Sequence, residues 1–176
     1  DMILFSLDIT QGGRVIRRIK NRDGRLYFHR ALRYGTCVCS IRRDSQRRAN
    51  IWFSTLFGGG TNYAHGEDTL FLRDAFLRGL RVYTSSFCLG TCAKDASTCF
   101  HGFDEKYFHD QGVLYRTAFG AAAAPLCLRF CLKRYRAYRR EMTFFRALRA
   151  MYRGTRETPR DKRPQRGTGA QRVERA

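Results

Sequence analysis

The feature of this sequence best suited to chemistry is a pair of carboxylates, Glu67 and Asp68, at the start of a predicted helix. A carboxylate beside an open cleft can accept the proton of a hydroxyl group, because it stays ionised near neutral pH. The helix dipole also favours acidic residues in a first turn, so the same pair is compatible with a purely structural role. The residues around the pair decide between the two interpretations.

The loop ahead of the acidic pair is rich in glycine, which has no side chain. It contains three consecutive glycines, which are Gly58, Gly59 and Gly60. Such a loop lets a ligand or another segment approach closely. His65 is adjacent to the pair, and His101 lies in a polar and aromatic segment downstream. We interpret these residues as candidates for substrate binding. For His101, an ordinary buried or solvent-facing histidine is the alternative.

The elements that must position the pair are a helix and two strands. The helix begins at the pair, Gly79 marks its end, and residues 80–84 then alternate as a strand does. Its apolar positions recur at helical spacing, and they are Leu70, Phe71, Ala75, Phe76 and Leu77. Residues 2–8 form a short apolar run typical of a buried strand. Strands and helices in this order predict an α/β fold.

The net charge is strongly basic and is concentrated toward the C-terminal end. The chain carries 34 Lys+Arg against 15 Asp+Glu, a formal charge of +19, and only five of the basic residues are Lys. Residues 129–176 contribute 16 basic and 4 acidic side chains, or +12 of the total. A nucleic-acid-binding module is therefore the chief alternative from another class of protein. The sequence shows no helix-turn-helix, zinc-finger or RNA-recognition signature, so we do not expect nucleic acid as a partner.

The basic C-terminal part divides into two segments. Residues 118–153 predict an amphipathic basic helical arm, in which the apolar run 118–128 is too short to span a bilayer. Basic and aromatic residues interleaved on a helix suit an anionic membrane surface, and ordinary packing against the rest of the chain is the alternative. Residues 154–176, rich in charge, glycine and proline, predict a disordered tail.

The cysteines predict a reducing compartment. There are seven, and no signal-peptide pattern opens the chain, so we expect free thiols in a cytoplasmic protein. The alternative is a zinc site formed by Cys88, Cys92, Cys99 and His101. Their spacing does not match the common zinc patterns, so we predict no metal site in this chain.

One long string resembles a known family. Residues 56–72 read LFGGGTNYAHGEDTLFL and continue into RGLRVY at 78–83, then Gly90-Thr91, Ser97-Thr98 and Gly102-Phe103. This resembles the acceptor-side segment of the family-2-like glycosyltransferases, bacterial enzymes with the A-type (GT-A) fold that build surface polysaccharides of the cell envelope. The resemblance covers roughly residues 1–153 and is strongest across 51–103.

The resemblance implies a reaction and roles for the residues named above. Such enzymes transfer a sugar from a nucleotide-diphospho-sugar donor to a hydroxyl of a surface-glycan or lipid-linked acceptor, with inversion. By this resemblance Asp68 is the general base and Glu67 its acidic neighbour. Beside it, we keep His65, His101 and the loop Gly58–Gly60 as our own candidates for contact with the acceptor. The implied location is cytoplasmic, peripheral at the inner face of the cytoplasmic membrane.

The departures from the family are as informative as the match. Members carry a nucleotide-holding stretch and an Asp-x-Asp motif that binds Mg²⁺ or Mn²⁺, and this sequence has neither. Cys99 also stands where relatives often carry a large aromatic residue. We therefore expect residues 1–117 to be the acceptor-side part of a domain that lacks its donor-binding half, roughly its first hundred residues.

Three expectations follow from the missing half. The chain holds no cofactor of its own, the donor and its metal are bound by the missing half, and the isolated chain is slow or inactive. An inactive remnant that acts through a partner chain is the alternative to a working enzyme.

Overall fold

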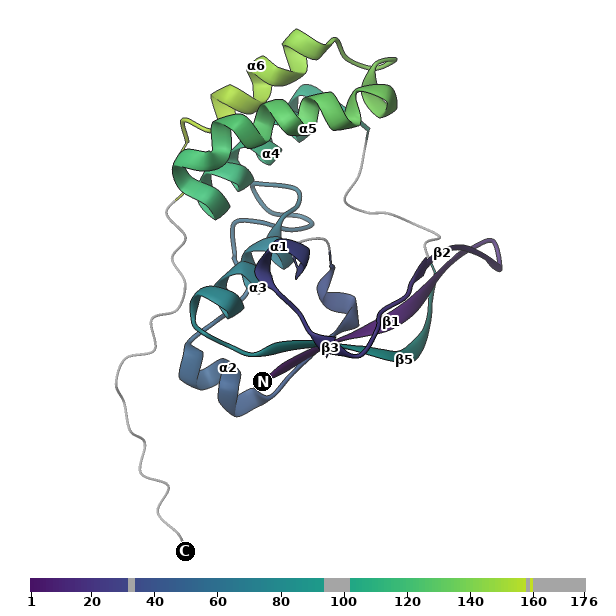
Figure 1. The fold of residues 1–176 in the computed structure, drawn as a ribbon. Coiled ribbons are helices and arrows are strands. Elements are labelled where there is room, and N and C mark those ends of the chain that lie inside the picture. Colours follow the sequence, from purple (N-terminus) through teal and green to yellow (C-terminus); the bar gives the residue numbers. More distant parts are fainter. Residues whose placement is uncertain (32–33, 94–101, 158, 160–176) are drawn as a thin grey trace, which may run out of the picture.

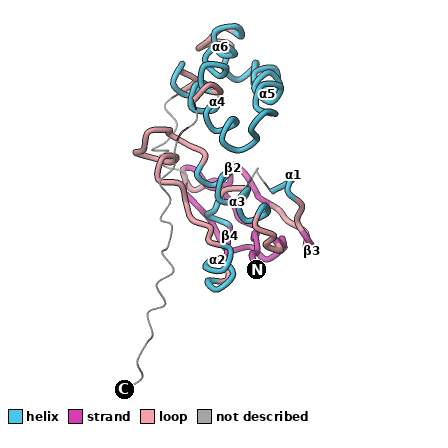
Figure 2. The backbone as a smooth tube through the Cα atoms, turned by 90° about the vertical axis from the view of Figure 1, so that its left-hand side faces the viewer, coloured by secondary structure: helices cyan, strands magenta, loops and turns pink. Residues whose placement is uncertain are grey.

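The chain folds into a curled mixed sheet with short helices around it, followed by a group of three longer helices (Figure 1). The computed structural model describes residues 1–31, 34–93, 102–157 and 159. A view turned by 90° shows the three helices gathered at one end of the molecule and the sheet at the other (Figure 2). The α/β class predicted from the sequence is confirmed.

The sheet is built around β1 (Met2–Gln11), which has neighbours on both sides. β2 (Arg14–Ile19) pairs with it antiparallel, and β5 (Val82–Ala93) pairs with it parallel on the other side. β3 (Gly24–Arg25) extends the sheet beyond β5, and β4 (Cys39–Ile41) pairs with the first residues of β1. The strands predicted over 2–8 and 80–84 are thus β1 and β5. Both end later than predicted, and β5 begins at Val82 rather than at residue 80.

Three helices belong to the sheet part. They are α1 (Phe28–Ala31), α2 (Arg43–Ala49) and α3 (Glu67–Leu77), with a 3₁₀ turn at Thr36–Val38. α3 begins at the acidic pair, as predicted. Its apolar side packs into a core shared with β1 and β5, and the core residues that it contributes are Phe71, Leu72 and Ala75. The chain reverses after α3 at Gly79, whose φ of 76° is a conformation that favours glycine.

The second part consists of α4 (Glu105–Phe119), α5 (Ala123–Tyr138) and α6 (Phe144–Gly154), with a 3₁₀ turn at Gly120–Ala122 between the first two. These helices enclose a core of their own, centred on Phe108 and Tyr138. The region 118–153, for which a helical arm is expected, holds the last residues of α4 together with α5 and α6. α4 itself begins at Glu105, so it runs across the expected boundary at residue 118.

Backbone contact holds α4 against α6. A Cβ atom added at Gly112 of α4 would lie 2.8 Å from the carbonyl carbon of Met151, and one at Gly154 would lie 2.9 Å from the amide nitrogen of Val113. Only hydrogen fits at either position. The two helices thus approach as closely as their backbones allow.

Residues 154–157, which the sequence predicts as the start of a disordered tail, are among the described residues. Gly154 is the last residue of α6, and the Glu157 carboxylate bonds to Nε2 of His109 at 3.0 Å and to the Tyr63 hydroxyl at 3.0 Å. The rest of the expected tail, residues 158 and 160–176, lies outside the described residues. None of the helices in the described ranges is both long and apolar enough to cross a membrane.

Candidate active site

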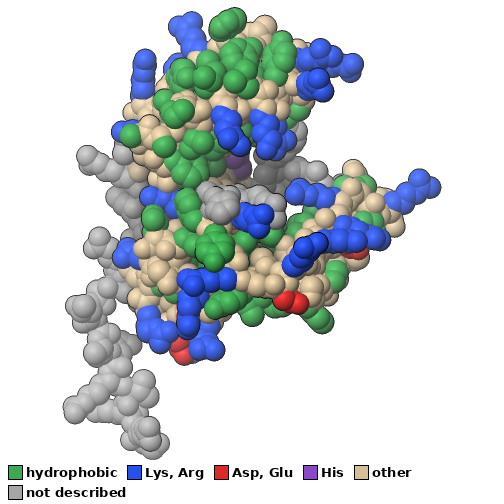
Figure 3. All heavy atoms as spheres, in the orientation of Figure 1, with side chains coloured by type: hydrophobic (Ala, Val, Ile, Leu, Met, Phe, Trp, Pro, Cys, Tyr) green, Lys and Arg blue, Asp and Glu red, His purple; other side chains and the backbone are tan. Residues whose placement is uncertain are grey.

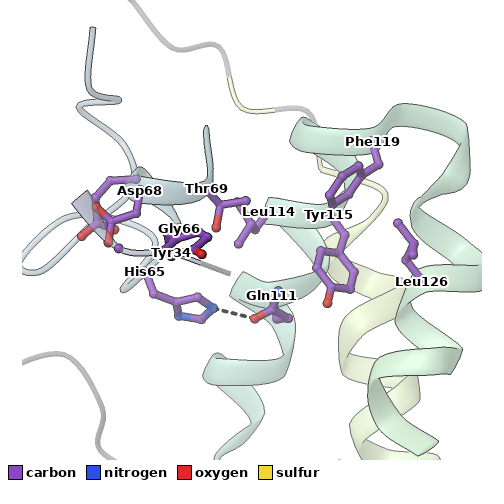
Figure 4. Close-up of a pocket in the computed structure, with 12 residues that line it drawn as sticks. Tyr34, His65, Gly66, Asp68, Thr69, Gln111, Leu114, Tyr115, Phe119 and Leu126 are labelled. Atoms are coloured by element: carbon purple, nitrogen blue, oxygen red, sulfur yellow. Dashed lines mark hydrogen bonds between the residues drawn. The ribbon is translucent and has the colours of Figure 1, made fainter. Parts of the chain in front are cut away.

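A cavity of about 480 Å³ lies between the start of α3 and the middle of α4, with one wall from α5 (Figure 4). Its polar lining residues are His65, Glu67, Asp68, Thr69 and Gln111. The structure therefore brings three of the residues predicted from the sequence to one cavity: Asp68, Glu67 and His65.

Asp68 is the second residue of α3 and is half-buried. Its Oδ1 atom accepts a hydrogen bond from the hydroxyl of Thr36. Gly35 makes room for the other oxygen, since a Cβ atom there would lie 3.2 Å from Oδ2 of Asp68. The loop at 35–36 thus fixes the direction of this carboxylate at the cavity wall.

Glu67 and the glycine loop lie against each other. A Cβ atom at Gly58 would meet the carboxylate carbon of Glu67 at 3.3 Å, and the φ of Gly58 is 126°. Gly58 is buried, whereas Gly59 and Gly60 are exposed, and none of the three lines the cavity. The backbone at Gly58 therefore packs against the side chain of Glu67. That the glycine loop contacts a substrate stays a prediction.

His65 is fixed by a residue of α4. Its Nε2 atom lies 3.1 Å from Oε1 of Gln111 (Figure 4). Its ring lies 5.0 Å from the ring of Tyr107. Burial lowers the pKa of His65, while the bond to Gln111 and the carboxylates of Asp110 and Glu67 act in the opposite direction. The lowered pKa favours a neutral ring. A neutral ring that donates from Nε2 to Gln111 leaves Nδ1 as an acceptor.

The loop that carries His65 has a second attachment to α4. Asp110 is buried, and its Oδ2 atom accepts hydrogen bonds from the Ala64 amide at 3.0 Å and from Nζ of Lys106 at 2.6 Å. Asp110 and Gln111 are not among the residues predicted from the sequence. An acid and an amide between the apolar residues Phe108 and Val113 were the signal that could have found them.

The entry into α3 is set by a contact between a glycine and a leucine. Gly66 has a φ of 116°, and a Cβ atom there would lie 2.7 Å from Cδ1 of Leu114. Only glycine satisfies both the backbone conformation and the space. Leu114 therefore packs directly on the turn that presents Glu67 and Asp68 to the cavity.

The remaining walls of the cavity are mostly aromatic and apolar. They are formed by Tyr34, Leu114, Tyr115, Phe119 and Leu126. Burial raises the pKa of Tyr115 to about 12, which keeps its phenol protonated at neutral pH. The Tyr34 hydroxyl donates to Oδ1 of Asn21 at 2.6 Å. A cavity with aromatic walls and a few convergent polar groups is typical of sites for small organic ligands.

Metal binding finds no support in the residues that the structure describes. Among them, no three His, Cys, Asp or Glu side chains lie where they could hold a metal ion. Cys88 and Cys92 are exposed free thiols, whereas Cys99 and His101 lie outside the described ranges.

Comparison with protein-family models gives no match to this chain, and none of the curated proteins matches it either. Among solved structures, one that is similar is the crystal structure of S. aureus TarS 1-349 in complex with UDP-GlcNAc. The TM-score is 0.47 at 15% sequence identity, over 80% of this chain and 42% of that one. The chain thus spans about two-fifths of that structure, and a likeness of this size assigns no function.

Proposed function

We propose that this chain is the acceptor-side part of a GT-A-type glycosyltransferase and that Asp68 is its general base. The observation that carries the proposal is the placement of the Asp68 carboxylate. It lines a cavity of about 480 Å³, and the Thr36 hydroxyl orients it there. The resemblance of residues 56–72 to the family's acceptor segment supports the same assignment.

In the proposed reaction, Asp68 takes the proton from a hydroxyl of the acceptor. The acceptor oxygen forms a bond to the anomeric carbon of the donor sugar. The bond from that carbon to the diphosphate oxygen breaks, and its electron pair leaves with the nucleotide diphosphate. Direct attack inverts the configuration at the anomeric carbon and leaves Asp68 protonated.

The neighbouring groups are suited to hold the acceptor hydroxyl near Asp68. His65 and Gln111 are joined to each other, so they form a fixed polar edge of the cavity. Tyr34 and Tyr115 offer aromatic surfaces against which the C–H face of a sugar ring can pack. The acceptor is a surface glycan or a lipid-linked glycan. On the resemblance alone, we assign the nucleotide-sugar donor and its Mg²⁺ or Mn²⁺ to residues outside this chain.

Ligand binding by the purified chain tests the acceptor site separately from catalysis. Saturation-transfer NMR with a mixture of neutral, N-acetylated and acidic oligosaccharides should detect at least one ligand. Leu126→Trp places a large side chain into the cavity and should abolish the signal. Leu128→Trp is the matched control, because Leu128 is two residues further along α5 and is 40% exposed. Equal signals from the two variants, or no oligosaccharide bound to the wild type, would overturn the acceptor assignment.

A further inference from the structure

A row of apolar side chains lies exposed on the two last helices. Leu128, Leu132 and Tyr135 follow one another at helical spacing along α5, with 40%, 61% and 42% of their surface exposed. Phe145, near the start of α6, is 81% exposed. We call these four residues the outer face.

The outer face is continuous across the turn between the helices. The ring of Tyr135 lies 6.2 Å from that of Phe144, which in turn lies 5.6 Å from that of Phe145. Figure 3 shows hydrophobic side chains gathered over α5 and α6, with Lys and Arg side chains around them. Large apolar side chains that gather on a surface in this way mark an interaction site.

The charge around the outer face has one sign. Residues 123–156 contain ten Lys or Arg and a single acid, Glu141. The Glu141 carboxylate is engaged elsewhere, since its Oε2 atom accepts a hydrogen bond from the Phe103 amide at 2.6 Å. Only two of the ten cations, Arg146 and Arg153, form ion pairs among the described residues, both with Glu105. The basic residues that follow or alternate with the apolar row are Arg129, Lys133, Arg136, Arg139 and Arg149.

A groove next to Phe145 combines both kinds of side chain. It has a volume of about 430 Å³ and is lined by Phe145, Leu148 and Tyr152 together with Arg149, Arg153 and Arg156. Guanidinium groups bind phosphate oxygens in a bidentate manner. An apolar wall beside them suits the carbon chain of an amphiphile.

We propose that the outer face binds the surface of an anionic lipid membrane. Leu132 and Phe145 enter the region between head groups and acyl chains, while the surrounding Arg and Lys side chains meet the lipid phosphates. A second copy of the chain fits less well, because it would bring two surfaces of like charge together. Nucleic acid would pair with the cations but offers no apolar phase for the exposed Leu and Phe side chains. The proposal is independent of the glycosyl-transfer reaction.

Co-sedimentation with lipid vesicles tests the proposal. The purified chain should bind vesicles of equal parts phosphatidylcholine and phosphatidylglycerol, and should not bind vesicles of phosphatidylcholine alone. Leu132→Gln should lower the partition coefficient of the chain between vesicles and water about tenfold, because the variant no longer buries this leucine side chain in the membrane. Leu77→Gln is the matched control: Leu77 is 63% exposed against 61% for Leu132, but it lies on α3. Residues 157–176 are the same in both variants, so any difference between them arises from the helices.

A fluorescence measurement locates the contact and does not depend on affinity. In a Trp52→Phe background, Phe145→Trp should shift its emission to the blue with the anionic vesicles. Leu77→Trp in the same background should not shift. Both positions are exposed, so both variants should fold, which circular dichroism checks.

Four results would overturn the proposal. The first two are equal partition coefficients for Leu132→Gln and Leu77→Gln, and equal binding of the wild type to neutral and anionic vesicles. The third is tighter binding of the wild type to RNA or DNA than to the anionic vesicles. The fourth is a wild-type dimer in sedimentation velocity that Leu132→Gln converts to a monomer. The last two would assign the outer face to nucleic acid and to a second copy of this chain, respectively.

Discussion

The Nε2 atom of His65 lies 3.1 Å from the Oε1 atom of Gln111, which fastens the loop ahead of α3 to the buried side of α4. The bond from the Ala64 amide to Asp110, at 3.0 Å, attaches the same loop one residue earlier. Two hydrogen bonds therefore join the loop at the start of α3 to the middle of α4. Because Asp68 is the second residue of α3, these two bonds also position the proposed base.

The free energy of unfolding should depend on pH, because His65 titrates at a lower pH in the folded chain than in the unfolded chain. Burial lowers the pKa of His65 in the folded chain, so the unfolded chain takes up the proton first as the pH falls. The contribution of His65 to the free energy of unfolding is complete above the ordinary histidine pKa of about 6.5 and is lost as the pH falls below it. Urea denaturation between about pH 8 and about pH 5 measures this.

His65→Gln provides the comparison for that measurement, because it removes the titration and keeps a polar side chain beside Gln111. The free energy of unfolding of the variant should depend less on pH below about 6.5 than that of the wild type. Parallel pH profiles for the two proteins would show that His65 titrates alike in the folded and unfolded chains.

Substitution of Gly66 should disturb the site more than substitution of a comparable glycine. Both Gly66 and Gly79 have a positive φ, 116° and 76°, so alanine is strained at either position. At Gly66 the added Cβ atom also meets Leu114 at 2.7 Å, whereas at Gly79 nothing lies within 4 Å. Gly79→Ala should cost on the order of 1 kcal/mol of stability and Gly66→Ala about 1–3 kcal/mol more. Chemical denaturation of the two variants gives the difference, and equal losses would mean that the Leu114 contact is loose.

Because α4 and α6 are in close contact, Gly112→Ala should change the free energy of unfolding in the direction opposite to the one that helix propensity predicts. Alanine is favoured over glycine inside a helix by about 1 kcal/mol, so Gly112→Ala should stabilise an isolated α4. In the folded chain the added methyl group would collide with the backbone of Met151. We therefore expect Gly112→Ala to lower the free energy of unfolding by on the order of 3 kcal/mol. A variant that is more stable than the wild type would contradict the close packing of the two helices.

Thiol reactivity should separate the exposed cysteines from those whose thiol pKa is raised by burial. Burial raises the pKa of Cys127 to about 12 and that of Cys39 to about 11, so neither forms much thiolate at pH 8. Cys88 and Cys92 are exposed. In a Cys99→Ser background, a chromogenic disulfide reagent should modify Cys88 and Cys92 first and Cys127 only after urea is added. Mass spectrometry of the labelled peptides identifies the order, and early labelling of Cys127 would show that the helical core is open.

The elements with a strong local pattern were predictable from the sequence. The apolar run of β1 and the acidic start and helical spacing of α3 were sufficient, and with α3 came Asp68, Glu67 and His65. β2 was not predicted, because five of its six residues are exposed and its basic sequence shows no alternation. α4 was not predicted, and the two residues that hold the site loop, Asp110 and Gln111, were missed with it.

The cavity itself could not be predicted, because it exists only where separate elements meet. Its walls come from the loop at Tyr34, from α3, from α4 and from α5. Their positions depend on contacts such as Gly66 with Leu114, which join residues far apart in the sequence. Periodicity and composition do not report such contacts, whereas a resemblance over a long string can indicate which residues meet.

The most direct test of the account is glycosyl transfer by the longest in-frame product that contains residues 1–176, compared between Asp68→Asn and Asp44→Asn. Each aspartate is the second residue of a helix, in α3 and α2, so each substitution removes the same first-turn charge. Asp44 is exposed and does not line the cavity. Release of nucleotide diphosphate from a panel of nucleotide sugars with glycan acceptors gives the rate. The account predicts that Asp44→Asn stays within about twofold of the wild type while Asp68→Asn loses about 100- to 10,000-fold. Similar rates for the two variants, or no transfer by the wild type from any donor, would contradict it.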